Sequence, residues 1–389
     1  MIGRRRAGRR AAGGLVAIVG NAALAACEAE YPQTTFRPVT GFGEALNSVF
    51  ANTFWWTMAI LVLVLALLVY VVIRFRERPG QPQPAQIHGS TKLELTWTTI
   101  PAIIIVLIAI PTVQTIFSTQ QRPTAEALEV EVVGHQWWWE FRYPEEAVVT
   151  ANQLVLPVGR EIHLRMRSAD VVHSFWIPRI GGKRDVNPVP ATVQGERPFA
   201  THLTFTIDEP GLYSGQCAEF CGASHAIMMM TALAVTAPEF DAWITSMGDP
   251  AAAPDTIAAP DTAAAPDTAA APAQPQAGDP LVAEGRRVFT SAPCIACHAI
   301  SGTSARGVLG PNLTRFGARP TIGAGALNNT QENLERWIRD PRSVKAGALM
   351  PGTRVGAPAP GNPAGPAYPP TGLTDEQVRA VAAYLLSLK

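Results

Sequence analysis

The chain has 389 residues, a formal net charge of zero at pH 7 and a hydrophobic content of 47%. This length predicts two or three domains, and the hydrophobic content indicates membrane segments. The balanced charge does not by itself identify a class of partner, and we expect no nucleic-acid partner. The chain has five cysteines, and each has a proposed role below, so none is left for a disulfide.

The amino terminus resembles a lipoprotein-type signal peptide over residues 1–26. A cluster of arginines precedes an apolar stretch at 14–24, and small residues lead directly into Cys27. Lipid attached to Cys27 would add about 0.8 kcal/mol of membrane affinity per buried CH2 group. An ordinary or uncleaved signal with an incidental cysteine is the alternative, and both predict export.

Two long charge-free intervals predict a transmembrane hairpin within residues 27–120. Their apolar cores predict helices at about 53–73 and 97–117, each long enough to cross a hydrocarbon core of about 30 Å. The loop between them carries four basic residues, Arg74, Arg76, Arg78 and Lys92. The positive-inside rule therefore places this loop in the cytoplasm and everything after residue 120 on the outer, periplasmic face of a bacterial cell membrane. A buried hairpin of a soluble protein is the alternative.

Residues 121–247 have the pattern of a small all-β domain. Short apolar or alternating runs, separated by proline and glycine, lie at 128–133, 148–149, 154–156, 162–166 and 202–207. They predict a cupredoxin-like Greek-key barrel with metal ligands in its loops. We expect three further histidines in this region to be structural: His135, His163 and His202.

Four residues in the last part of this region predict a soft-metal site. Cys217 and Cys221 are followed by His225 and Met228, and His173 is the candidate for a second imidazole. Thiolate, thioether and imidazole together favour copper, and two cysteines indicate two copper ions bridged by sulfur. A zinc site with two cysteines and two histidines is the alternative, but zinc would leave Met228 without a role.

The composition changes twice more before the carboxyl terminus. Residues 248–280 consist mainly of Ala, Pro, Asp and Thr, with a repeated Ala-Pro-Asp-Thr, and predict an extended linker. Residues 281–389 have helical patterns, including a run at 333–338 and a capping box from Thr374 to Gln377. They predict a small all-α domain.

The all-α region contains a haem attachment pattern. Cys294 and Cys297, with His298 directly after the second cysteine, are typical of c-type haem, whose iron the histidine binds. Met350 is the candidate for the second axial ligand, and a core methionine is the alternative. A redox pair or half a zinc ribbon would share the cysteine spacing, but export of the chain and Met350 favour haem.

Residues 281–389 resemble class I cytochrome c. The resemblance rests on Gly285 and Phe289, the segment 310–313, Met350 and Tyr384, which occur in the family's order. It implies that the first and last helices cross where Gly285 meets Tyr384. It also implies that His298 and Met350 are the axial ligands, a pair that favours electron transfer over oxygen chemistry.

Residues 44–247 resemble cytochrome c oxidase subunit II through the hairpin, the segments 134–139 and 170–178, and the block 217–228. The resemblance implies a dinuclear copper A centre. Glu219 would contribute its backbone carbonyl and place its carboxylate on a magnesium ion at the subunit I interface. The copper ligands implied are His173, Cys217, Glu219, Cys221, His225 and Met228.

The same resemblance implies two further roles. Trp137 matches the family's electron-entry tryptophan, with core packing as the alternative, and Glu94 matches a carboxylate at the mouth of a proton pathway, with an ordinary interfacial carboxylate as the alternative. The sequence departs from the family after Asp185, where Pro188 is followed by Val189 instead of a glycine-arginine turn. This departure puts the contacts of that loop with subunit I in doubt.

A subunit II fused to a cytochrome c is the pattern of caa3-type oxidases. It implies an electron-transfer subunit of a proton-pumping terminal oxidase, with partners in subunit I, the other oxidase subunits, membrane lipid and a cytochrome c or other membrane-side donor. Residues 121–247 carry 15 acidic and 9 basic side chains, whereas 281–389 carry 6 and 12, so we expect opposite fields to steer docking. A copper A-containing nitric oxide reductase and a stand-alone membrane-tethered carrier are the alternatives.

Overall fold

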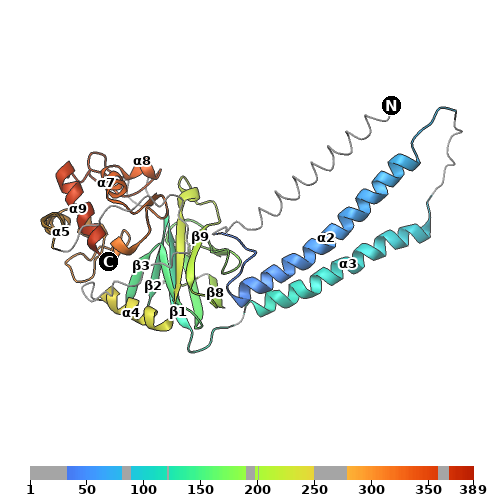
Figure 1. The fold of residues 1–389 in the computed structure, drawn as a ribbon, viewed down its shortest axis with the longest axis horizontal. Coiled ribbons are helices and arrows are strands. Elements are labelled where there is room, and N and C mark those ends of the chain that lie inside the picture. Colours follow the sequence, from blue (N-terminus) through green and yellow to red (C-terminus); the bar gives the residue numbers. More distant parts are fainter. Residues whose placement is uncertain are drawn as a thin grey trace, which may run out of the picture.

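The computed structural model has three parts arranged in a row: a long helical hairpin, a β-sandwich and a mostly helical domain (Figure 1). The predicted signal with Cys27 and most of the predicted linker lie outside the described residues. The structure describes residues 33–80, 89–120, 122–189, 198–199, 201–248, 278–357 and 368–389.

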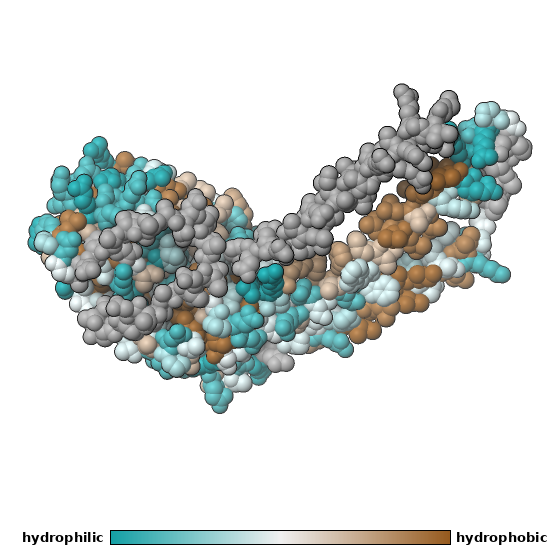
Figure 2. Space-filling model, in the orientation of Figure 1, coloured by the Kyte–Doolittle hydropathy of each residue, from teal (hydrophilic) through white to brown (hydrophobic). Residues whose placement is uncertain are grey.

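The hairpin consists of α2 (Gly41–Arg74) and α3 (Thr91–Ser118), which lie side by side (Figure 1). Their most apolar windows have no buried residue, and both helices are long and apolar enough to cross a membrane. The apolar surface that this leaves exposed is visible along the hairpin (Figure 2). Because no other described part of the chain covers these apolar windows, they do not form the core of a soluble domain.

Both helices extend beyond the charge-free cores that the sequence marks out. Thr40 caps α2, and its side chain accepts a hydrogen bond from the Gly43 amide at 2.9 Å. The same hydroxyl donates to the carbonyl of Ile180, so the cap also joins the hairpin to the sandwich. Polar first turns, with Glu44 in α2 and Glu94 in α3, therefore belong to the helices although charge excluded them from the predicted cores.

The sandwich consists of two five-stranded sheets with a shared apolar core. The first has the order β3-β2-β1-β5-β8 and the second β4-β10-β9-β6-β7. Each contains one parallel pair, β1 with β5 and β4 with β10. The strands are β1 (Leu128–His135), β2 (Trp138–Tyr143), β3 (Val148–Ala151), β4 (Gln153–Pro157), β5 (Glu161–Ser168), β6 (His173–Trp176), β7 (Arg184–Val186), β8 (Thr201–Thr206), β9 (Gly211–Cys217) and β10 (Met229–Val235).

The all-β class and the five predicted runs are confirmed, and the other strands adjoin the functional motifs. His173 begins β6, Cys217 ends β9, and Met229 begins β10. The loop between β9 and β10 is closed at its base by the Cys217 amide, which donates to the Met228 carbonyl at 2.9 Å. Adjacent strand ends therefore fix both ends of the candidate metal loop.

The third part is built around two crossing helices, α5 (Pro280–Ser291) and α9 (Asp375–Ser387). The predicted capping box at Thr374 is present, and Val378, Val381 and Leu385 are buried as expected. A minimal pair, β11 (Thr321–Ile322) with β12 (Leu327–Asn328), adds a β element to this mostly α domain. The remaining helices are α6 (Cys294–Cys297), η3 (Phe316–Ala318), α7 (Gln331–Arg339) and α8 (Pro341–Val344), while α4 (Ala237–Gly248) follows the sandwich.

Gly285 lies at the crossing of α5 and α9, as the cytochrome resemblance implies. A Cβ there would stand 1.9 Å from the Ala380 carbonyl oxygen and 2.8 Å from the Tyr384 Cβ. We expect Gly285→Ala to destabilise this domain by about 1 to 3 kcal/mol, the usual cost of overpacking. Chemical denaturation followed by haem absorbance measures the effect, and Gly278→Ala, which meets no atom within 4 Å, is the matched control. Equal stability of the two variants would contradict this packing.

Candidate metal centre and haem pocket

Two buried sulfur atoms form the middle of the candidate metal centre. The Sγ atoms of Cys217 and Cys221 lie 3.8 Å apart, with Cys217 at the end of β9 and Cys221 in the following loop. The Ala218 amide donates to the Ser174 carbonyl at 2.9 Å, which holds the loop against β6. The sequence spacing of four residues therefore becomes a close sulfur pair.

Each sulfur has one imidazole beside it. The Nδ1 of His173 lies 3.9 Å from the Sγ of Cys217, and the Nδ1 of His225 lies 3.6 Å from the Sγ of Cys221. The thioether of Met228 lies 3.8 Å from Cys221, and the backbone carbonyl of Glu219 lies 3.2 Å from Cys217. All six predicted ligands therefore meet in one cluster.

The two methionines after Met228 point elsewhere. Met229 packs against Gly325 of the mostly helical domain, and Met230 packs against Gly215 within the sheet. The three other histidines of the sandwich have different partners: His135 contacts Glu140, and His163 contacts Thr204 and the ring of His202.

Asp170 fixes the orientation of the His173 ring. Its Oδ1 lies 2.8 Å from Nε2 of His173, and its other oxygen accepts the Gln136 amide at 2.7 Å. Burial lowers the pKa of His173, but hydrogen bonds to Asp170 and Cys217 outweigh burial and raise it. Burial raises the pKa of Asp170, but its bonds to His173 and two amides outweigh burial and lower it. An ionised Asp170 that accepts the Nε2 proton leaves Nδ1 of His173 directed at the sulfur pair.

The two thiols influence each other strongly. The hydrogen bond from Cys221 lowers the pKa of Cys217 to about 3, and the same contact raises the pKa of Cys221. The close contact therefore favours the charged form of Cys217 and the neutral form of Cys221. Six donors exceed the four that a structural zinc ion takes, and two sulfurs with one imidazole each fit a pair of soft metal ions that share the thiolates.

The haem-attachment motif lies on α6 and the residue that follows it. The Nδ1 of His298 donates to the Pro311 carbonyl at 2.8 Å, and burial lowers the pKa of His298, so the ring is neutral with a free Nε2. Gly310 makes room for this ring, since a Cβ there would lie 2.7 Å from it. Burial raises the pKa of Cys294 to about 11 and raises that of Cys297. Neutral thiols argue against a redox pair, whose attacking cysteine has a lowered pKa.

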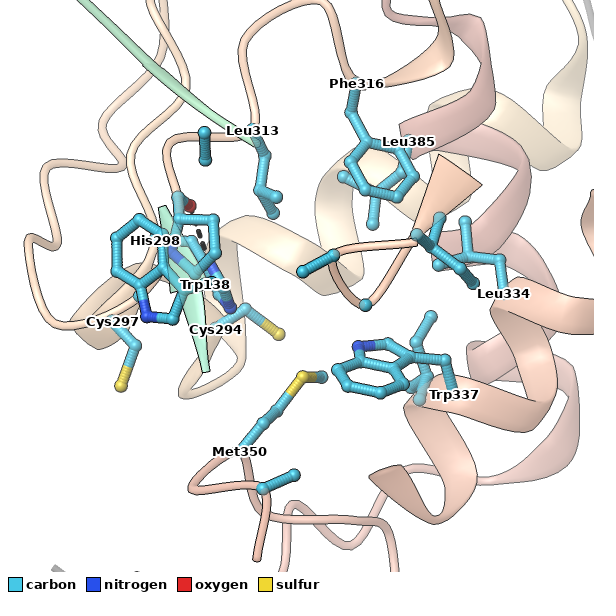
Figure 3. Close-up of a pocket in the computed structure, with 18 of the residues that line it drawn as sticks. Trp138, Cys294, Cys297, His298, Leu313, Phe316, Leu334, Trp337, Met350 and Leu385 are labelled. Carbon is cyan, nitrogen blue, oxygen red and sulfur yellow. Dashed lines mark hydrogen bonds between the residues drawn. The ribbon is translucent and has the colours of Figure 1, made fainter. Parts of the chain in front are cut away.

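A mostly apolar cavity of about 230 Å³ adjoins the motif. His298 and Met350 reach it from different loops, and Met350 lies beside Trp337 (Figure 3). Most of its other lining comes from apolar side chains, including Leu313, Phe316 and Leu385. The imidazole, the thioether and the apolar lining would suit a haem, which His298 and Met350 would hold.

A buried arginine in the cavity wall was not predicted. Arg319 is 8% exposed, burial lowers its pKa to about 10, and among the described residues no carboxylate pairs with it. Its Nη2 donates to the carbonyls of Asn312 at 2.5 Å and Thr314 at 3.3 Å. Haem propionates would supply the missing negative charge. No local sequence signal identifies Arg319, because only the fold turns it inward.

Trp137 lies between the two sites. Its Nε1 donates to the Cys221 carbonyl at 3.0 Å, and its side chain is in the wall of the haem cavity. The neighbouring Gln136 donates to the same carbonyl at 2.8 Å. Trp137 is only 9% exposed, because its ring packs against Gly347 of the mostly helical domain.

Glu94 is apart from both sites. It is exposed in the first turn of α3, at the end of the hairpin remote from the sandwich (Figure 1). It joins neither the sulfur cluster nor the cavity, which is compatible with a role at the other side of a membrane. Part of the departing loop after Pro188 lies outside the described residues.

Comparison with known proteins assigns the parts to families. Family models match the transmembrane domain of cytochrome c oxidase subunit II at 38–115, its periplasmic domain at 146–235 and cytochrome c at 282–389. A cytochrome c oxidase subunit 2 from Alkalihalophilus pseudofirmus is 37% identical over 322 residues, covering 81% of this chain and 79% of that relative. The chain belongs to the cytochrome c oxidase subunit II family. It carries a fused cytochrome c domain, as resemblance to caa3-type oxidases implies.

Two further similarities place this subunit II among its relatives. A cytochrome c oxidase subunit 2 from Bacillus sp. PS3 is 35% identical over 331 residues, covering 81% of this chain and 80% of the relative. A quinol oxidase subunit 2 from Bacillus spizizenii is 35% identical over only 178 residues, 44% of this chain and 53% of that relative.

Among solved structures, the periplasmic domain of subunit II of cytochrome oxidase from Bradyrhizobium japonicum is 28% identical, with a TM-score of 0.29 over 32% of this chain and 96% of that one.

Membership of the family makes this subunit II part of a haem-copper oxidase complex with a role in electron transfer. The family and the cytochrome c domain imply copper A and haem c as cofactors. The sulfur cluster and the apolar cavity fit these two groups by their donor atoms and lining. We refer below to the sandwich as the copper domain and to residues 278–389 as the haem domain.

Proposed function

We propose that this subunit II passes electrons from haem c to the dinuclear copper A centre and on to subunit I, where oxygen is reduced to water with proton translocation. The position of Trp137 supports this order, because its indole bonds the copper loop while its ring borders the haem cavity. When bound, each metal group supplies one-electron redox chemistry. The residues of the chain hold the two groups and separate them from water.

In the copper domain, the proposed roles follow from the donor geometry. Cys217 and Cys221 would bridge the metal pair, and Asp170 would hold His173 in the tautomer that presents Nδ1. Strand ends on both sides of the loop keep these atoms in place, so little rearrangement would accompany a change of charge. The proposed ligands are His173, Cys217, the Glu219 carbonyl, Cys221, His225 and Met228.

In the haem domain, Cys294 and Cys297 would form the thioether bonds, with His298 and Met350 as axial ligands. The neutral ring of His298, whose proton is directed at Pro311, is ready to bind iron without first losing a proton. An axial pair of His and Met raises the reduction potential and leaves no open position for oxygen. The haem domain would therefore transfer electrons only.

The proposed setting is the bacterial cell membrane, with the hairpin in lipid and both redox domains on the outer face. Glu94, at the remote end of α3, would take up protons from the cytoplasmic side. The Glu219 carboxylate would bind magnesium at the contact with subunit I. Cytochrome c or another membrane-side donor would reduce the haem domain. Residues 248–280 would link this domain to the copper domain at 121–247. Residues 1–26 would be the export signal.

Replacing Trp137 by phenylalanine tests the proposed order. The variant keeps an aromatic ring but loses the Nε1 bond to Cys221, so we expect electron transfer from haem c to copper to slow roughly 10- to 100-fold, as misplacement of a reacting group does. Flash-induced oxidation of haem c in the assembled oxidase measures this rate. Trp243→Phe is the control, because Trp243 packs against Tyr143 and Phe240 and lines neither site. Equal rates in both variants would contradict the proposal.

The same preparation distinguishes an oxidase subunit from a stand-alone carrier. We expect a large multi-span haem subunit to co-purify with this chain from detergent-solubilised membranes. Isolation of the chain alone, with both metal groups bound, would favour the carrier.

A further inference from the structure

Lys345 is a lysine of the haem domain whose side chain enters the copper domain. It follows α8 and is only 3% exposed. Its Nζ donates to the carbonyls of Trp137 at 2.6 Å, Ile227 at 2.8 Å and Gly323 at 2.7 Å. Two of these acceptors belong to the copper domain and one to the haem domain.

The three bonds use every donor of a protonated amine. An ammonium group has three N–H donors and no acceptor, and here each donor has a backbone carbonyl. Burial lowers the pKa of Lys345 to about 7, which reflects the cost of removing this charge from water. If the domains separated, the amine would lose two of its three acceptors, so its bonding is complete only when they are docked.

Other contacts around Lys345 connect the same two surfaces. The Ser224 hydroxyl donates to the Ala346 carbonyl at 2.6 Å. Gly347 has a left-handed backbone, and a Cβ there would stand 2.5 Å from the ring of Trp137. The haem domain thus bonds the loop that carries the candidate ligands and packs on Trp137.

One backbone hydrogen bond reports directly on docking. The Met229 amide, at the start of β10, donates across the interface to the Ala324 carbonyl at 2.9 Å. Among the described residues, none of the ion pairs joins the two domains. In the described part of the contact, therefore, the charged group that joins the two domains is a buried lysine bonded to neutral carbonyls.

We propose that Lys345 is an interdomain latch, which keeps the haem domain docked on the copper domain during turnover so that the two redox sites act as one rigid unit. The docking follows from the contacts above, and its role in electron transfer rests on the proposed function. Because the haem domain covers Trp137, an external donor would have to deliver its electron to the haem domain.

Lys345→Met in the full-length chain, within the assembled oxidase, tests the latch. Methionine keeps the length of the side chain but loses all three bonds. Hydrogen bonds of a charged group are each typically worth a factor of roughly 10 to 100, so we expect hydrogen exchange at the Met229 amide to accelerate by at least about that factor. Amides inside α9 should keep their protection. Lys389→Met, at an exposed position of the same domain, is the matched control and should leave Met229 unchanged.

Electron transfer provides a second measurement. With the latch removed, the haem domain would have to dock again before each transfer, so the rate from haem c to copper should fall with solvent viscosity, whereas the unmodified oxidase should show no such dependence. Unchanged Met229 protection in Lys345→Met would overturn the latch. If that variant does not fold, exchange in the unmodified oxidase decides, because a Met229 amide that exchanges as fast as an unprotected amide would also overturn it. Absence of a dinuclear copper spectrum or of covalent haem in the unmodified oxidase would instead contradict the proposed function.

Discussion

Replacing Cys221 by serine should eliminate the dinuclear copper centre and stop the oxidation of haem c. Cys221 is the centre of the cluster, with Cys217, His225 and Met228 all within 3.8 Å of its sulfur. A serine hydroxyl remains protonated and is a poor ligand for a soft metal. Since outer-shell changes alone cost about 10- to 100-fold, loss of a bridging ligand should lower electron transfer by more than about 100-fold.

Metal analysis and electron paramagnetic resonance of the purified oxidase measure this loss. Met230→Leu is the control, because Met230 is buried in β10 close to the cluster but packs against Gly215. It should keep both copper ions. A Cys221→Ser variant with two copper ions and an unchanged spectrum would show that the cluster is not the metal site.

Replacing both Cys294 and Cys297 by alanine should remove the covalent haem and unfold the haem domain. The cavity of about 230 Å³ would then be empty. At about 24 cal/mol per Å³, an empty space of this size costs about 5 kcal/mol, which is comparable to the whole stability of many small domains. Haem staining after denaturing electrophoresis and proteolysis of the membrane-bound oxidase measure the two effects.

The loss of copper in one variant and the loss of haem in the other should be independent. The alanine variant should keep its copper spectrum, because all proposed copper ligands lie in the copper domain, and Cys221→Ser should keep its haem. Retention of covalent haem by the Cys294→Ala, Cys297→Ala variant would contradict the attachment site.

The ligand clusters were predictable from the sequence because their chemistry is concentrated in short segments. Cys217 to Met228 and Cys294 to His298 each carry most of their donors within twelve residues, so the spacing already limits the geometry. Only His173 and Met350 had to be brought from elsewhere, and in both cases the structure places the candidate beside the rest of its site. The crossing at Gly285 followed from the resemblance to class I cytochrome c, and the structure places Gly285 against Ala380 and Tyr384.

The strands next to the metal loop were harder to predict from the sequence. β2 runs through consecutive tryptophans and a charged pair, and β9 contains two glycines, so neither shows simple alternation. Tertiary pairing forms them: Trp139 is fully buried although it follows the more exposed Trp138. Glu140 stays buried because His135 and Arg142 pair with it.

The interdomain contacts could not be predicted from the sequence at all. Lys345 looks like an ordinary surface lysine after a short proline-initiated helix, and its three acceptors are backbone carbonyls, which every residue has. Arg319 likewise looks like a surface charge. Only the folded chain shows that both are buried. The opposite net charges of the two domains predicted electrostatic steering, but no ion pair between described residues joins the domains.

Electron paramagnetic resonance with metal analysis of the purified oxidase tests the central claim most directly. The account predicts hyperfine splitting shared over two equivalent copper nuclei, with two copper ions and one covalent haem per chain. A single-copper spectrum, or zinc in place of copper, would contradict the copper A assignment and the electron route from haem c to subunit I.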